Sequence, residues 1–238
     1  MDLGIAGKVA LVTAASKGLG RGAALALSRE GCSVVICARH TDRLNETAAE
    51  LPGDTLAIAA DVTEPQTPAK LVEETLEQFG RLDIVVANAA GPPKARALEV
   101  DEAGMRSALE ANLMTSIRLV QAAVPHLRAA GWGRIVLLTS NAVKQPIPDL
   151  AYSNTARTGL WAWAKTAAQD LIGDGITLNL VCPGLHATDR VLQLGRGEDL
   201  LGDPEDLGRV VAFLCSTSAA FVSGVALQVD GASTLALL

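Results

Sequence analysis

Hydrophobic residues of this chain gather in short runs of consecutive apolar positions, and longer amphipathic segments separate these runs from one end to the other. Runs rich in Val, Ile and Leu are typical of strands that are covered on both faces of a sheet. The predicted strands are Val9–Thr13, Ser33–Ala38, Thr55–Ala59, Ile84–Ala87, Arg134–Thr139, Ile176–Val181 and Ala226–Val229. The predicted helices are Arg21–Glu30, Asp42–Glu50, Pro65–Phe79, Ala103–Ala130, Tyr152–Ile172 and Pro204–Leu214.

This alternation of strands and helices predicts the fold class. Strands that take turns with helices form a parallel sheet through right-handed crossovers. We therefore expect an α/β protein with a doubly wound parallel sheet of about seven strands and helices on both faces. No repeat, low-complexity tract or linker interrupts the pattern, so we expect residues 1–238 to form one domain, whose loosest segment is His186–Gly202.

The composition excludes several other classes of protein. An apolar content of 49% in 238 residues is too high for a disordered chain, and the 22 glycines lack the three-residue period of collagen. A net charge of −6 gives no electrostatic reason for binding nucleic acid or an anionic membrane. The sequence has no uncharged apolar stretch of about 18 residues that would span a bilayer. Asp2 stands where a secretion signal would have lysines, so we expect a mature cytoplasmic protein.

The cysteines and histidines show no metal-binding pattern. Four cysteines and three histidines are scattered along the chain, and no two cysteines have the C-x-x-C spacing. We therefore expect no metal site, and we expect the cysteines to be buried, reduced thiols.

A glycine-containing turn follows the first predicted strand and leads directly into a helix. Its sequence is Thr13-Ala14-Ala15-Ser16-Lys17-Gly18-Leu19-Gly20. Such a turn aims free backbone N–H groups and the positive end of a helix at an anion. Gly18 is expected to let the backbone approach a pyrophosphate, and Gly20 to let the helix pack against the strand.

Arg39 follows the second strand, where NAD-binding folds usually have an acidic residue. Its guanidinium instead suits a 2′-phosphate, which favours NADP(H) over NAD.

The turn resembles T-G-x-x-x-G-x-G, the cofactor turn of the short-chain dehydrogenase/reductase (SDR) family, with Ala14 in place of the first glycine. The methyl group of Ala14 is expected to fit as long as this residue avoids positive φ. Further matches follow in the order of the family, at Asp61-Val62, Asn88-Ala89, Asn112, Thr139-Ser140, Pro183-Gly184 with Thr188, and Val229-Asp230-Gly231. The resemblance covers essentially the whole chain and implies a single-domain, Rossmann-type oxidoreductase.

The resemblance also implies roles for individual residues. The implied cofactor contacts are Thr13, Ser16, Lys17, Gly18, Leu19, Gly20, Arg39, Asp61, Val62, Asn88, Ala89, Arg157, Pro183, Gly184 and Thr188. Asp61 and Val62 match the adenine contact, and Lys17 is the second cation that NADP-preferring members tend to have. Asn112 matches the helix asparagine that holds a proton-relay water, and Ser140 matches the catalytic serine.

The remaining catalytic residues depart from the family pattern. Ordinary members have a tyrosine thirteen residues after the serine and a lysine four residues later. The tyrosine hydroxyl exchanges a proton with the substrate oxygen, while the lysine ammonium lowers the tyrosine pKa and binds the nicotinamide ribose. Counting from Ser140 reaches Ser153 and then Arg157, and the usual intervals to Lys165 and Pro183 support this register.

Tyr152, the only tyrosine, stands one position before the aligned one, and adjacent helical residues point about 100° apart. Three interpretations stay open. In the first, the helix begins differently and Tyr152 swings into the crevice as the acid. In the second, Ser153 or Ser140 binds the carbonyl, and Arg157 or Lys144 supplies the positive field. In the third, the fold keeps its cofactor or pocket but has lost ordinary carbonyl reduction.

These interpretations define two functions of different classes. The first function is that of an NADP(H)-dependent oxidoreductase that transfers a hydride between nicotinamide and a carbonyl or alcohol, such as a 3-oxoacyl- or polyketide-like ketone. The second is that of a cyclase-like or lyase-like enzyme, or of a cofactor-binding regulator. Arg157 can bind the ribose, but its pKa above about 12 prevents it from surrendering a proton, so a relay would need another path such as Asn112 with water.

The resemblance further implies a substrate lid and an assembly. We expect the lid at His186–Gly202, with Arg190, Arg196, Glu198 and Asp199 on it. In this family the two long helices usually pair across a two-fold axis, so we expect a homodimer or homotetramer with Trp161 and Trp163 in an interface or in the core.

Overall fold

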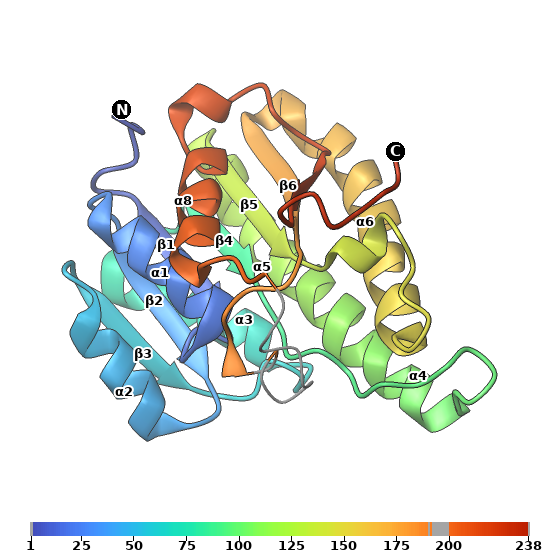
Figure 1. Cartoon of the computed structure of the whole chain (residues 1–238). Helices are drawn as coiled ribbons and strands as arrows, with labels where there is room; N and C mark the ends of the chain where they lie inside the picture. The colour runs from blue at the N-terminus through green and yellow to red at the C-terminus, as the bar shows by residue number, and fades with distance from the viewer. Residues whose placement is uncertain (1, 190, 192–199, 238) are drawn as a thin grey trace.

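Seven strands pair in parallel in one sheet, in the order β3-β2-β1-β4-β5-β6-β7 (Figure 1). This computed structural model describes residues 2–189, 191 and 200–237. The strands are β1 (Val9–Thr13), β2 (Ser33–Ala38), β3 (Thr55–Ala59), β4 (Ile84–Ala87), β5 (Gly133–Leu138), β6 (Ile176–Pro183) and β7 (Ala226–Val229). The chain builds outward from β1 to β3 and then returns to place β4 beside β1. Open α/β sheets bind ligands at such a switch point, beyond the carboxyl ends of the strands.

Helices cover both faces of the sheet. Described helices are α1 (Gly18–Arg29), α2 (Thr41–Glu50), α3 (Thr67–Phe79), α4 (Glu102–Leu109), α5 (Thr115–Ala130), α6 (Ala151–Leu171) and α8 (Pro204–Leu214). Buried side chains of α1, α2 and α8 pack on one face of the sheet, and those of α3, α5 and α6 pack on the other. The predicted doubly wound α/β fold is therefore confirmed.

The two halves of the core divide the strand residues by alternation. Ala10 and Val12 of β1 face the core under α1 and α8, whereas Leu11 between them faces the core under α3, α5 and α6. Both faces of the strand are buried, which explains why the sequence shows continuous apolar runs instead of an alternating pattern. All four cysteines are buried and free, as predicted. Burial raises the pKa of the Cys37 thiol to about 12 and so keeps it protonated at neutral pH.

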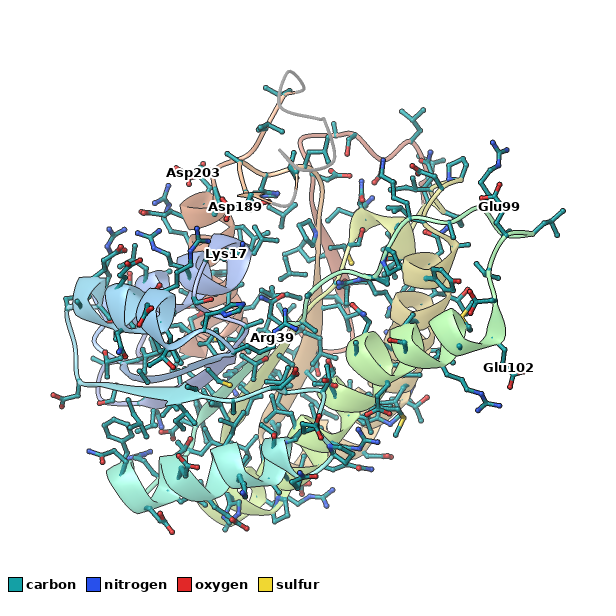
Figure 2. All side chains as sticks on the ribbon, turned by 90° about the horizontal axis from the view of Figure 1, so that it is seen from below. Lys17, Arg39, Glu99, Glu102, Asp189 and Asp203 are labelled. Atoms are coloured by element: carbon teal, nitrogen blue, oxygen red, sulfur yellow. The ribbon has the colours of Figure 1, made fainter. Side chains whose placement is uncertain are left out.

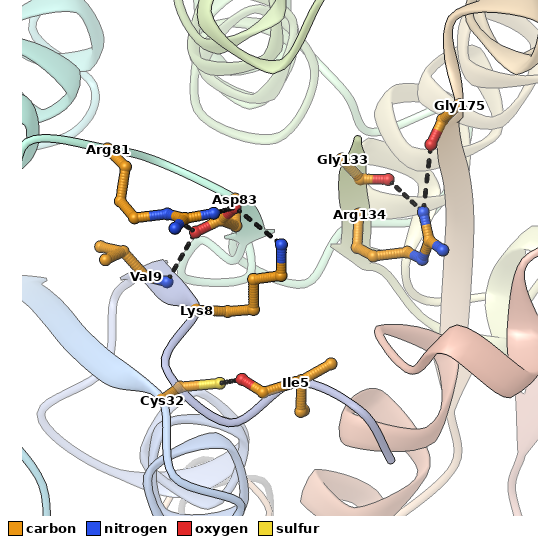
Figure 3. A network of polar contacts seen from close by, with 9 residues as sticks. All are labelled: Ile5, Lys8, Val9, Cys32, Arg81, Asp83, Gly133, Arg134 and Gly175. Atoms are coloured by element: carbon orange, nitrogen blue, oxygen red, sulfur yellow. Dashed lines mark hydrogen bonds and ion pairs between the residues drawn. The ribbon is translucent and has the colours of Figure 1, made fainter. Parts of the chain in front are cut away.

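Polar contacts fasten the strands at the amino-terminal edge of the sheet, opposite the predicted site (Figure 3). The buried carboxylate of Asp83 accepts hydrogen bonds from the Val9 backbone N–H at 2.9 Å, from Lys8 at 3.3 Å and from Arg81 at 2.7 Å. Arg134, which is 3% exposed, donates to three backbone carbonyls, at 2.8, 3.2 and 3.3 Å. The Arg134 backbone N–H donates to the Asp83 carbonyl at 3.0 Å, so β1, β4 and β5 are held together at this edge.

One long predicted helix is interrupted. Where the sequence predicts a helix over Ala103–Ala130, a π-helical turn, Glu110–Met114, separates α4 from α5. Helical periodicity alone does not reveal this extra residue per turn, because the residues on both sides keep their amphipathic pattern. In the part of the chain that the structure describes, no helix has the length and apolar character needed to cross a membrane.

Candidate active site

Polar residues that the sequence separates widely meet at the carboxyl edge of the sheet. Thr13 ends β1, Arg39 follows β2, Asn88 follows β4, Ser140 follows β5 and Pro183 ends β6. Parallel strands end at the same edge, so these residues lie together where open α/β sheets have their ligand-binding crevice. Figure 2 views the molecule from this side and labels Lys17 and Arg39, while Glu102, the first residue of α4, lies at the far right of the view.

The glycine-containing turn is tied to β4 by a closed set of hydrogen bonds. The Thr13 hydroxyl donates to the Asn88 carbonyl at 2.8 Å and accepts from the Asn88 backbone N–H at 2.9 Å. The Asn88 side-chain amide donates to the carbonyl of Ala14 at 3.2 Å. A Cβ on Gly20 would lie 2.4 Å from that same carbonyl oxygen, so only glycine fits there. These contacts hold the turn in a shape that presents its backbone to the crevice.

Two residues of the turn have left-handed backbone conformations. Gly18 has a φ of +56°, which glycine adopts without cost. Ala14 has a φ of +48°, so the condition under which its methyl group was expected to fit without strain is not met. The hydrogen bonds from Asn88 to the Ala14 carbonyl, and from the Ala15 N–H to Cys37 at 3.0 Å, hold this conformation. A left-handed alanine costs about 1–2 kcal/mol, which the surrounding contacts offset.

Three cations stand at the ends of β1 and β2 and at the first turn of α2. Two of them, Lys17 and Arg39, are predicted cofactor contacts; the third, Arg43, is not. The signal available in the sequence was its position three residues after His40, the N-cap of α2, and so close to Arg39. The guanidinium of Arg39 lies 4.0 Å from the Asp61 carboxylate. Lys17 at 2.9 Å and Arg43 at 3.0 Å both donate to one oxygen of Asp189.

Asp61, one of the residues expected beside the adenine, forms hydrogen bonds with a residue close to it in the sequence. The Asp61 carboxylate accepts from the backbone N–H and the hydroxyl of Thr63, at 2.9 and 2.8 Å. These hydrogen bonds lower the pKa of Asp61, so this group is ionised at neutral pH. Val62 is buried, and the backbone carbonyl of Ser16 accepts from Thr47, which ties the turn to α2. Leu19 and Ala89 are half-buried beside them.

The loop after β6 lies against the glycine-containing turn. A Cβ on Gly18 would lie 3.2 Å from the methyl carbon of Thr188. Gly184, which follows Pro183, donates its N–H to the Val229 carbonyl at 3.0 Å, and a Cβ there would lie 2.7 Å from that of Asp230. The rest of the predicted lid, residue 190 and residues 192–199, lies outside the described residues, and Arg190, Arg196, Glu198 and Asp199 belong to this part.

Ser140, Ser153 and Arg157 occupy the catalytic half of the crevice. The Ser140 hydroxyl accepts from the Ala142 N–H at 3.2 Å and is half-buried. Arg157 is 7% exposed and donates to the carbonyl of Leu138, the last residue of β5, at 3.1 Å. Ser153 lies one turn before Arg157 and is 6% exposed. The structure thus brings a buried positive charge to the strand end that carries Ser140.

Tyr152 and Lys144, the other two predicted catalytic residues, are held by contacts elsewhere. The buried Tyr152 hydroxyl accepts from the backbone N–H of Asp101 at 3.1 Å, at the amino end of α4. A Cβ on Gly104 in α4 would lie 2.5 Å from this hydroxyl, so the phenol fills the space that this glycine leaves. The Lys144 ammonium lies 4.3 Å from the ring centroid of Trp161 on α6. For Tyr152 to act in the crevice, its contact with α4 would have to break.

Asn112 has an unsatisfied amide in the π-helical turn that packs against α6. Its side chain is 3% exposed, and both its amide nitrogen and its carbonyl oxygen lack a hydrogen-bond partner within the described part of the chain. Buried polar groups without partners are costly and rare in proteins. A water or a ligand would satisfy the amide of Asn112, and the role of this residue in holding a relay water stays a prediction.

A doubly wound parallel sheet with such a turn and such strand ends defines a dinucleotide-binding α/β protein. A family model described as enoyl-(acyl carrier protein) reductase matches residues 13–234. Human dehydrogenase/reductase SDR family member 4 is 30% identical, over 95% of this chain and 87% of the human protein. Versicolorin reductase 1 of Aspergillus parasiticus is 33% identical, over 94% of this chain and 95% of its own.

A solved structure agrees with these relatives. L-sorbose reductase from Gluconobacter frateurii, complexed with NADPH and L-sorbose, has a TM-score of 0.91 and 31% identity, over 97% of this chain and 98% of its own. The chain belongs to the short-chain dehydrogenase/reductase family, as its sequence motifs predict.

Proposed function

We propose that this protein is an NADP(H)-dependent oxidoreductase that transfers a hydride between nicotinamide and a carbonyl or alcohol substrate. The observation that carries the proposal is the turn around Gly20, where the Ala14 carbonyl and the Asn88 amide leave no space for a side chain, next to a group of three cations. Relatives described as reductases, one of them complexed with NADPH, support the reaction class. The substrate class that we propose is a 3-oxoacyl- or polyketide-like ketone.

The residues of the crevice fit NADP(H). The turn from Thr13 to Gly20 would hold the pyrophosphate through backbone N–H groups, and Asp61 with Val62 would border the adenine. Lys17 and Arg39 would pair with the 2′-phosphate, which NAD lacks. When bound, the cofactor supplies or accepts the hydride; the protein has to place the substrate and manage the charge of its oxygen.

The catalytic half of the crevice supports the second of the three interpretations. Ser140 would donate a hydrogen bond to the substrate oxygen, and the buried guanidinium of Arg157 would favour negative charge developing there. Arg157 does not surrender protons, so the proton would reach the oxygen from water. The amide of Asn112, which has no hydrogen-bond partner in the described part of the chain, is suited to hold such a water, and the hydroxyl of the buried Ser153 would relay its proton.

A binding and turnover assay tests this proposal. The full chain would be titrated with NADPH by fluorescence and then mixed with NADPH and a set of ketones, including 3-oxoacyl thioesters, while the absorbance of the reduced nicotinamide is followed. We expect saturable binding and consumption with at least one ketone. Ser140→Ala should bind NADPH like the wild type but consume it much more slowly. If the wild type does not bind NADPH, the proposal is wrong.

A second function is favoured by the side chains at the aligned catalytic positions. Serine and arginine replace the tyrosine and lysine, and the only tyrosine is engaged with α4. This arrangement would also suit a family relative that catalyses a cyclisation or elimination, or that binds the cofactor only as a regulator. NADPH binding without consumption across the whole set of ketones would favour this alternative.

We also propose that the chain forms a homodimer or homotetramer through α5 and α6. An apolar surface groove of about 280 Å³ lies between these helices, and Trp163 lines it together with Val120 and Val124. Aromatic side chains in a shallow apolar groove are typical of a subunit interface. Sedimentation of the full chain should therefore give twice or four times the monomer mass, and Val124→Glu should shift it toward the monomer.

A further inference from the structure

Asp189 places a carboxylate between two of the three cations at the adenosine end of the crevice. One of its oxygens, Oδ2, lies 2.9 Å from Nζ of Lys17 and 3.0 Å from a guanidinium nitrogen of Arg43. Lys17 belongs to the turn before α1 and Arg43 to the first turn of α2, whereas Asp189 comes from the loop after β6. Figure 2 shows Asp189 beside Lys17. Three segments that are distant in sequence therefore converge on one oxygen atom.

The same position suits the 2′-phosphate of the proposed cofactor. A phosphate oxygen bound by both Lys17 and Arg43 would have to lie within hydrogen-bond distance of the two nitrogens, where Oδ2 of Asp189 lies. Two anions cannot share that position, because they exclude each other sterically and repel each other electrostatically. Hydrogen bonds from Lys17 and Arg43 lower the pKa of Asp189, so the carboxylate is charged at neutral pH.

We propose that Asp189 is an internal anion that occupies the 2′-phosphate subsite of the cofactor-free protein and that NADP(H) displaces it on binding. This inference rests on the proposed function only for the identity of the cofactor. It adds Arg43 to the phosphate ligands and makes Asp189 a residue that sets the affinity for the 2′-phosphorylated cofactor.

The exposure of the three side chains determines how much Asp189 lowers the affinity for the 2′-phosphorylated cofactor. Lys17, Arg43 and Asp189 are 53%, 55% and 48% exposed, so each ion pair is screened by water and is weak. A phosphate, with nearly two charges and three acceptor oxygens, displaces such a carboxylate. The displacement still reduces the apparent affinity, because only the fraction of molecules with a vacant subsite is competent to bind. A cofactor with a 2′-hydroxyl does not require the displacement.

Calorimetric titration with two adenosine nucleotides tests this inference without requiring catalysis. The probes are 2′,5′-ADP, which carries the 2′-phosphate, and 5′-AMP, which lacks it. The test variant is Asp189→Asn, and the matched control is Asp42→Asn. Asp42 is exposed, stands one residue before Arg43 and has no ion pair among the described residues, so its variant removes an equal charge from the same region. Thermal melting confirms that both variants fold.

We expect Asp189→Asn to bind 2′,5′-ADP about threefold to tenfold more tightly than the wild type, as two weak ion pairs predict. The affinity for 5′-AMP should not change, and Asp42→Asn should change the 2′,5′-ADP affinity by less than about twofold. Equal effects of the two variants would overturn the inference. Weaker 2′,5′-ADP binding by Asp189→Asn would also overturn it, because Asp189 would then hold Lys17 and Arg43 in position for the phosphate.

The outcome is separable from that of the proposed function. Tighter binding of 2′,5′-ADP by Asp189→Asn, combined with no ketone reduction, would support this inference and contradict the oxidoreductase. If the wild type reduces a ketone but the two variants bind 2′,5′-ADP equally, the oxidoreductase is supported and this inference is overturned.

Discussion

The two halves of the crevice follow the family pattern to different degrees. At the adenosine end, the turn, the cations and the Asp61 contact all stand where the family motifs place them, and a network through Asn88 holds the turn. At the catalytic end, only Ser140 and Asn112 keep their positions, while Ser153 and Arg157 replace the usual tyrosine and lysine. By its motifs, the chain therefore follows the family more strictly at the proposed cofactor-binding end than at the proposed catalytic end.

This difference has a physical basis. Binding at the adenosine end depends on backbone conformation and on glycines with no space around them, so most substitutions there disturb the fold as well. Proton transfer at the catalytic end depends on one hydroxyl at one position of α6, and a serine there leaves the helix intact. Changes in chemistry are thus easier to accommodate in the second region than in the first.

The largest expected effect comes from restoring the usual pair in the catalytic half. Ser153→Tyr combined with Arg157→Lys places a phenol and an ammonium at the aligned positions. We expect kcat/KM for ketone reduction to rise by about 100-fold, because a positioned general acid contributes 10²–10⁴-fold. The control, Ser153→Phe with Arg157→Lys, has the same bulk without the hydroxyl and should show no gain. Retained NADPH binding would show that both variants fold, and no gain from the tyrosine would contradict this view of the site.

A smaller but still large effect is expected at Gly20. A Cβ there would lie 2.4 Å from the Ala14 carbonyl oxygen, so Gly20→Ala has to shift the start of α1. We expect a loss of NADPH affinity of about tenfold or more and a loss of unfolding free energy of about 1–3 kcal/mol. Gly173→Ala is the control, since a Cβ there meets nothing within 4 Å. Unchanged NADPH affinity in Gly20→Ala would remove the turn from the cofactor site.

The cations of the adenosine end should have a moderate and selective effect. Lys17→Ala and Arg39→Ala should each weaken NADPH binding by about fivefold to tenfold, as the loss of one partly exposed charge-assisted bond predicts, and should leave NADH binding unchanged. Arg106→Ala, on the exposed face of α4, controls for net charge. Fluorescence titration measures all three variants with both cofactors. Equal losses for NADPH and NADH would contradict the assignment of these cations to the 2′-phosphate.

Tyr152 should affect stability more than catalysis. Tyr152→Phe removes the acceptor of the Asp101 N–H and should lower the unfolding free energy by about 1 kcal/mol. The kcat for ketone reduction should stay within about twofold, because the hydroxyl is engaged with α4 rather than with the substrate. A kcat reduced by two orders of magnitude, with NADPH binding intact, would instead identify Tyr152 as the proton donor.

The smallest effect is expected at Ala14. Ala14→Gly relieves the strain of its positive φ and should raise the unfolding free energy by about 0.5–1 kcal/mol, after the greater entropy of glycine in the unfolded chain is subtracted. Ala49→Gly, on the exposed side of α2, should instead lower it by about 1 kcal/mol. Urea unfolding measures both, and a loss of stability in Ala14→Gly would show that the turn tolerates the left-handed alanine without strain.

The sequence was sufficient to predict the fold and the position of the glycine-containing turn within it. Apolar runs define every strand of the sheet to within two residues, and a motif such as Thr13–Gly20 is local, so its residues remain together in the fold. The sequence was insufficient to predict contacts between segments that are distant along the chain. The φ of Ala14 depends on hydrogen bonds to Asn88 and Cys37, and the pairing of Asp189 with Lys17 joins residues from opposite ends of the chain.

The catalytic end shows the same limit. The motif register predicts that Tyr152 stands one position before the aligned residue, but it does not give the direction of the phenol. That direction depends on the space left by Gly104 and on the free N–H of Asp101, which belong to another helix. Neither residue belongs to a motif of the sequence, and both contact Tyr152 only because α4 packs against α6.

Transfer of deuterium from labelled cofactor to product tests the central claim most directly. The wild-type protein would be incubated with NADPH deuterated at C4 of the nicotinamide and a set of ketones, and the alcohols formed would be examined by mass spectrometry. Hydride transfer predicts an alcohol heavier by one mass unit with at least one ketone. Saturable NADPH binding with no labelled alcohol from any ketone would show that this crevice holds the cofactor without using it as a reductant.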